Sequence, residues 1–132
     1  MTRFDADDAQ ARRKLFADAI DAHRTRASAF LTVEADHDPD VDGEDAPAPW
    51  LQFAESTFNL DVDEDELDRL KGLLGEFPAF RIDQMESPEE ADGTNVRVTA
   101  RSDANRLAAF ADRVFLEVYG REDDYRAWVA AV

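Results

Sequence analysis

The sequence contains no cysteine and only two lysines among its 132 residues. Without cysteine the chain can form no disulfide bond and offers no thiolate to a metal, which excludes a disulfide-dependent secreted scaffold. It also lacks an apolar run approaching 18 residues, and its first ten residues have no apolar segment typical of a signal peptide. The sequence therefore predicts a cytoplasmic protein with no membrane association.

Carboxylates are present in large excess. The chain has 31 acidic residues, 20 of them Asp, against 15 basic residues, 13 of them Arg, and its formal charge is -16. In dilute buffer such a surface repels itself, but at about 1 M salt the Debye length falls to roughly 3 Å and the repulsion is screened. The preference for Asp over Glu and for Arg over Lys resembles the proteomes of haloarchaea, which keep molar KCl inside the cell. The resemblance implies a halophilic protein with an acidic surface.

Hydrophobic periodicity predicts a single α+β domain over residues 1–132. Helices are expected over 7–28, 63–75 and 102–119, and Tyr125, Trp128, Val129 and Val132 indicate a short C-terminal helix. Strands are expected over 30–34, 50–53, 57–60, 80–83 and 96–101. The segment 35–49 is rich in acids and prolines and predicts a solvated loop. The order α-β-β-β-α-β-β-α predicts a mostly antiparallel five-stranded sheet with helices packed on one face.

This element order resembles the type III secretion chaperone-like fold shared by the small YbjN-type proteins. The resemblance covers about residues 7–119 and is carried by the segments LTVEA, WLQFAESTFNL, AFRIDQ and NVRVTAR, together with the helix from Leu67 to Leu74. It implies helices on one face of a mostly antiparallel sheet, and a dimer that binds other proteins rather than an enzyme.

Strand alternation divides the predicted sheet into an apolar face and a polar face. The polar face is expected to carry three arginines, Arg81, Arg97 and Arg101, with Asn59 and Thr99 beside them. Guanidinium groups suit carboxylates, phosphates and interfaces from which water is removed. Three interpretations remain open: cross-strand salt pairing with Asp83 or Glu34, an interface with a second copy or another protein, and an anion or nucleic-acid site.

The candidate metal ligands are Asp38, Asp40 and Asp42, which with Gly43 match the first half of a calcium-binding loop. Counted from Asp38, the twelfth position should hold a bidentate Glu, but it holds Pro49. We therefore expect no resident cofactor, with calcium or diffusely held cations as the alternative at this loop.

Catalytic signatures are missing from the sequence. The two histidines, His23 and His37, have no evident orienting partner and are predicted to be ordinary surface side chains. Nucleophile-elbow, phosphate-loop, dinucleotide and zinc-protease motifs do not occur. The sequence therefore favours a protein that is not an enzyme.

Two hypotheses of function follow from the arginine-bearing face. The first is a cytosolic protein-binding or adaptor protein that acts as a homodimer or captures another protein. The second is a small-molecule binding protein or enzyme that holds an anionic metabolite with Arg81, Arg97 and Arg101. Nucleic-acid binding by the basic residues of the first helix is disfavoured by the net charge. Those residues are Arg12, Arg13, Lys14, Arg24 and Arg26.

Overall fold

The fold is known from a computed structural model, which describes residues 4–26, 30–36, 48–87 and 93–130. The helices are α1 (Ala9–Arg26), α3 (Glu64–Leu74), α4 (Ala104–Arg113) and a π-helical turn, η1 (Val114–Val118), that continues α4. The strands are β1 (Phe4–Ala6), β2 (Leu31–Ala35), β3 (Trp50–Ala54), β4 (Thr57–Val62), β5 (Phe80–Glu86), β6 (Thr94–Ala100) and β7 (Ala127–Ala130).

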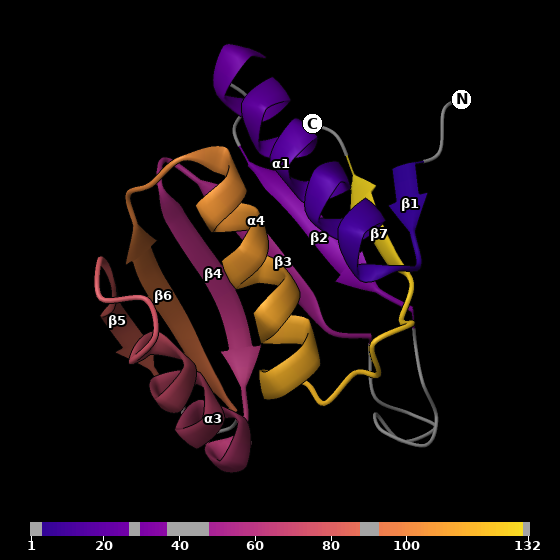
Figure 1. Cartoon of the computed structure of the whole chain (residues 1–132). Helices are drawn as coiled ribbons and strands as arrows, with labels where there is room; N and C mark the ends of the chain where they lie inside the picture. Colours follow the sequence, from indigo (N-terminus) through magenta and orange to yellow (C-terminus); the bar gives the residue numbers. More distant parts are fainter. Residues whose placement is uncertain (1–3, 27–29, 37–47, 88–92, 131–132) are drawn as a thin grey trace.

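The strands form one antiparallel sheet in the order β1-β7-β2-β3-β4-β6-β5. Helices α1, α3 and α4 lie together on one face of it (Figure 1). The α+β class and the one-sided helical layer predicted from the sequence are therefore confirmed, whereas the predicted number of strands, five, is wrong because the sheet has seven. The two added strands are β1 and β7, and they pair with each other.

The C-terminal segment is the clearest correction. A helix was expected there, but residues 127–130 form β7, which lies between β1 and β2. Ala127 and Val129 are buried while Trp128 is half-buried, which is the alternation of a strand.

Local sequence signals set the helix ends. Asp63 and Glu66 form a capping box: the Asp63 carboxylate accepts from the Glu66 N–H at 2.7 Å, and the Glu66 carboxylate accepts from the Asp63 N–H at 2.8 Å. Asp103 caps α4 in the same way by accepting from the backbone N–H of Arg106. Gly120 has a φ of 68°, the left-handed conformation that ends a helix with least strain when the residue is glycine.

The core lies between the helical layer and the sheet. Side chains of both layers interlock there, as the rings of Phe53 and Phe58 (4.9 Å between centroids) and of Phe58 and Phe110 (5.4 Å) illustrate. The predicted apolar face of the sheet is confirmed: Leu31, Val33, Phe58, Leu60, Phe80, Val96 and Val98 are all buried, and Ile82 is half-buried.

A buried ion pair crosses this core. Arg12 on α1 donates from Nε to Asp112 Oδ1 on α4 at 2.8 Å, and from Nη1 to the carbonyl oxygens of Asp123 and Tyr125. The Tyr125 hydroxyl donates to the same Asp112 oxygen, and the Arg12 guanidinium lies 4.0 Å from the centre of the Tyr125 ring. Burial, followed by the charge of Asp112, raises the pKa of the Tyr125 hydroxyl. Arg12 thus fastens α1 to α4 and to the segment that leads into β7.

Candidate functional site

The sheet face opposite the helices carries the candidate site. Cross-strand pairing arranges its side chains in rows, since residues that face each other on neighbouring strands project to the same side. One row contains Thr57, Thr99 and Arg81, in which Thr57 pairs with Thr99 and Thr99 with Arg81. The next row contains Gln52, Asn59, Arg97 and Gln84. Arg101 follows the last residue of β6.

The three arginines of this face have no carboxylate partner in the described part of the chain. Arg97 donates a long hydrogen bond of 3.4 Å from Nη1 to Gln84 Oε1, and Arg81 and Arg101 make no hydrogen bond or ion pair with any described residue. By contrast, Arg113 and Arg126 each contact more than one carboxylate. The cross-strand salt pairing considered from the sequence is therefore absent among the described residues.

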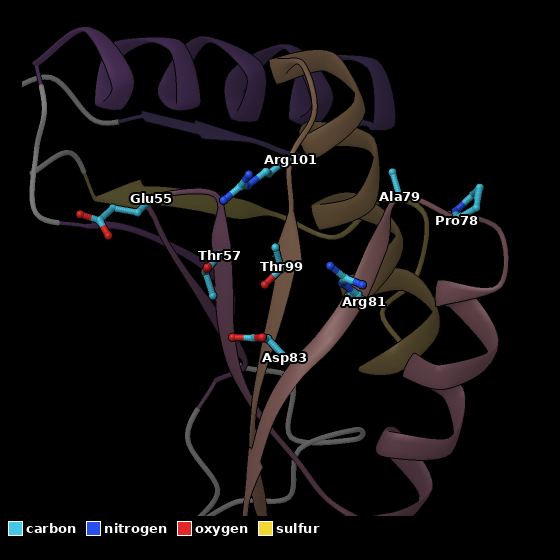
Figure 2. Close-up of a pocket in the computed structure, with 8 residues that line it drawn as sticks. All are labelled: Glu55, Thr57, Pro78, Ala79, Arg81, Asp83, Thr99 and Arg101. Carbon is cyan, nitrogen blue, oxygen red and sulfur yellow. The ribbon is translucent and has the colours of Figure 1, made fainter.

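The open face is hollowed in two adjoining places. The first hollow has a volume of about 550 Å³ and receives Arg81 and Arg101 (Figure 2). Its other lining residues are Glu55, Thr57, Pro78, Ala79, Asp83 and Thr99. The second, of about 360 Å³, receives Arg97 and is lined also by Phe30, Gln52, Ala54, Glu55, Thr57, Asn59 and Asp83. Since Glu55, Thr57 and Asp83 belong to both, the hollows form one continuous surface, which we call the arginine face.

All five predicted site residues lie on this surface. Thr99 stands between Arg81 and Arg101 in Figure 2, and Asn59 faces Arg97 across β4 and β6. Asn59 is not free, because its Oδ1 accepts from Asn95 Nδ2 at 2.7 Å. The carboxylates of Glu55 and Asp83 share the hollows, so the face presents both signs of charge, an arrangement that sequence reasoning did not foresee for Glu55.

Asp83 has its position because β5 contains a bulge. The register of β5 against β6 shifts between Ile82 and Gln84, which makes Asp83 the extra residue. As a result, Arg81 and Glu86 lie on the same face of the sheet although they are five positions apart in the sequence. Ile82 and Met85 lie on the opposite, helix-bearing face, where Met85 is 48% exposed.

The candidate metal ligands Asp38, Asp40 and Asp42 fall outside the described residues. Within the described ranges, no group of three or more His, Asp or Glu side chains is placed to hold a metal ion. None of the described helices is both long and apolar enough to cross a membrane.

The prediction that His23 is a surface side chain is wrong. His23 is 8% exposed, and its ring meets that of Phe53 edge-on at 5.7 Å between centroids. Burial, and then the nearby positive charge of Arg24, lower its pKa. Its Nδ1 atom is buried without a hydrogen bond. No carboxylate orients the ring among the described contacts, so His23 does not have the environment of a catalytic base.

The basic residues of α1 do not form one surface. Arg12 is fully buried, Lys14 pairs with Asp18 at 3.0 Å, and Arg24 donates to the carbonyl oxygen of Ser102 at 3.0 Å. A nucleic-acid site needs several cations free to meet phosphates. The structure therefore gives no support to nucleic-acid binding by this helix.

Comparison with known families covers the whole chain. Residues 1–132 match the model of a family of unknown function, DUF7975. The chain belongs to this family. No curated protein and no solved structure matches it. The expected likeness of this DUF7975 member to the type III secretion chaperone-like fold thus finds no support.

Proposed function

We propose that this DUF7975 protein is a non-enzymatic binding protein of a salt-rich cytoplasm, which captures a carboxylate-bearing protein on its arginine face. The observation that carries the proposal is the lack of carboxylate partners for Arg81, Arg97 and Arg101 among the described residues of a chain with 31 acidic residues. Arginine forks bind carboxylates in bidentate geometry, and arginine is enriched at protein interfaces.

The mixed lining of the face favours a protein over a small anion as the ligand. Glu55 and Asp83 lie in the same hollows as the arginines, so a partner that offers both carboxylates and a cation matches the surface better than a compact polyanion. Half-buried Thr57, Asn59 and Thr99 add hydrogen-bonding groups between the charges. Phe30, 43% exposed at the rim, supplies apolar contact area.

The test is capture in molar KCl, which keeps so acidic a protein folded. The tagged protein, its Arg97→Glu/Arg101→Glu variant and a Lys71→Glu control would be incubated with a cytosolic extract of a haloarchaeon. Lys71 is exposed on α3, away from the arginine face. We expect a stoichiometric acidic protein to bind to the wild type and the control, and to be lost from the double variant. Equal capture by all three proteins would refute the proposal.

A second candidate function rests on the first hollow alone. Arg81 and Arg101 line it together with the hydroxyl-bearing Thr57 and Thr99, and these groups would hold the carboxylate or phosphate of a metabolite. Phosphate and citrate, titrated at constant ionic strength, should then raise the thermal midpoint of the wild type and not that of Arg101→Glu. An equal shift in both proteins would eliminate this candidate.

A further inference from the structure

The edge of the sheet offered by β5 is the strongest unexplained feature outside the arginine face. β5 is the last strand in the sheet and pairs only with β6 in the described part of the chain. With seven residues it is longer than β1, the three-residue strand at the other end. Residues Asp83–Glu86 are exposed. An edge strand presents unpaired backbone N–H and C=O groups that can pair with another strand.

The side chains of β5 are complementary to those of a second β5. When two copies meet antiparallel about a two-fold axis between Asp83 and Gln84, Arg81 of one copy faces Glu86 of the other, and Ile82 faces Met85. Both members of each pair lie on the same side of the sheet, because the bulge at Asp83 places Arg81 and Glu86 on the open face and Ile82 and Met85 on the helix-bearing face. The two-fold repeats each contact twice.

In the single chain, the β5 side chains Arg81, Met85 and Glu86 are exposed. Arg81 makes no ion pair with a described residue, and Glu86 accepts only a hydrogen bond from the side chain of Gln84. Met85 is one of two large apolar side chains with substantial exposure among the described residues, at 48%. Pairing would cover Met85 with Ile82 of the second copy and would give Arg81 a carboxylate.

We infer that the protein forms a two-fold dimer through antiparallel pairing of β5 with β5 of a second copy, with Arg81 opposite Glu86 and Ile82 opposite Met85. The bulge in β5 is compatible with this pairing, since it sets which side chains share a face. The two seven-stranded sheets become continuous, and Arg97 and Arg101 of both copies remain on one open surface. Arg81 belongs to both proposals: in the dimer it faces Glu86 of the second copy, and Arg97 and Arg101 remain for capture. The capture test changes only Arg97 and Arg101, so the two proposals are tested separately.

Cross-linking tests the register directly, because the chain has no cysteine of its own. Ile82→Cys and Met85→Cys variants would be prepared with different tags and oxidised mildly in molar KCl. In the inferred register, residue 82 of one chain faces residue 85 of the other chain, and not residue 82 of the other chain. A disulfide-linked dimer is therefore expected when the two variants are mixed, and not from either variant alone. Cross-links from each variant alone, or none in the mixture, would overturn the register.

Charge exchange tests the same contact without cysteine. Light scattering of the wild type in molar KCl should give twice the 14.9 kDa mass of one chain. Arg81→Glu and Glu86→Arg should each raise the dimer dissociation constant about tenfold, since each places like charges opposite one another twice. The double variant Arg81→Glu/Glu86→Arg should restore the wild-type dissociation constant, and Lys71→Glu should leave the dissociation constant unchanged.

Two results would overturn the inference. One is a wild-type mass of a single chain at concentrations up to about 100 µM, at which a standard interface is occupied. The other is a dimer whose dissociation constant is unchanged by Arg81→Glu and by Glu86→Arg. Circular dichroism of each variant would show that the fold is kept. Failure here would leave capture by Arg97 and Arg101 untouched, and loss of capture in Arg97→Glu/Arg101→Glu would leave the dimer mass unchanged.

Discussion

The Arg12 guanidinium and the Asp112 carboxylate meet in the interior, 2.8 Å apart, with side chains 0% and 3% exposed. Asp112→Ala would leave the arginine charge buried without its partner and deprive the Tyr125 hydroxyl of its acceptor. We expect the free energy of unfolding, measured by urea titration in molar KCl, to fall by about 3–5 kcal/mol.

An exposed ion pair on α1, the helix that carries Arg12, provides the control for this prediction. Asp18 holds Lys14 at 3.0 Å, with both side chains largely exposed. Asp18→Ala should therefore cost under about 0.5 kcal/mol. A loss at Asp112 as small as that at Asp18 would show that the buried pair does not fasten α1 to α4.

Protonation of His23 should weaken the fold as the pH falls. Its pKa is lowered in the native state, so the unfolded chain binds a proton more readily, and unfolding becomes easier below the ordinary histidine pKa of about 6.5. We therefore expect the free energy of unfolding of the wild type to fall between pH 7.5 and 5.5, and His23 to cause no change above pH 7.5. His23→Leu should remove this slope, whereas His37→Gln, at the other histidine, should keep it. Parallel pH profiles for all three proteins would contradict the prediction.

The capping box of α3 should contribute measurably to stability. Asp63→Ala removes the acceptor of the Glu66 N–H and the reciprocal bond loses its geometry, so we expect a loss of about 1 kcal/mol in the urea titration. Asp65→Ala is the matched variant, since Asp65 also lies in the first turn but makes no capping bond. If both variants were equally stable, the caps would have no energetic role.

Salt should stabilise the protein well beyond the level usual for proteins. Self-repulsion of a chain with formal charge -16 extends over roughly 10 Å at 0.1 M salt but over about 3 Å at 1 M. The thermal midpoint should therefore rise steadily between 0.1 and 2 M KCl. Replacing KCl by an equal osmolarity of sucrose separates screening from solute exclusion. A midpoint independent of KCl would contradict a halophilic adaptation.

Local signals were sufficient to predict the centre of this fold. Alternation in β4 and β6, such as Phe58 and Leu60 against Thr57 and Asn59, identified which face would be buried, because a strand covered on one side needs a period of two. Asp63 and Glu66 marked the start of α3, since their side chains bond to backbone groups only three residues away. Features determined by neighbours in sequence were therefore accessible.

Features determined by distant partners were not. β7 has four residues, too few for the sequence alone to distinguish a strand from a helical turn, and it is a strand because β1 and β2 flank it. Arg12 stands in a run of basic residues that is typical of a solvated face, and its partner Asp112 lies 100 positions away. The interior position of His23 likewise depends on Phe53, which a helix pattern does not reveal. The bulge at Asp83 has no sequence signal that we recognise.

The candidate site lies between these extremes. Alternation placed Arg81, Arg97 and Arg101 on one face, and they lie on the hollowed surface. Whether their guanidinium groups would find carboxylates was not predictable, because that depends on side-chain directions across three strands. The order of β6 beside β4 rather than β3, which decides the neighbours of Arg97, is likewise a property of the complete sheet.

The place of β7 also constrains how the protein is made. In the described part of the chain, β1 pairs with no strand but β7, and β2 meets β7 along its second edge. During synthesis, residues 127–130 are the last of the described strands to leave the ribosome. Until then, β1 and β2 lack β7 as their partner. The sheet is completed by pairing between strands that lie far apart in the sequence, and pairing over such long separations slows folding.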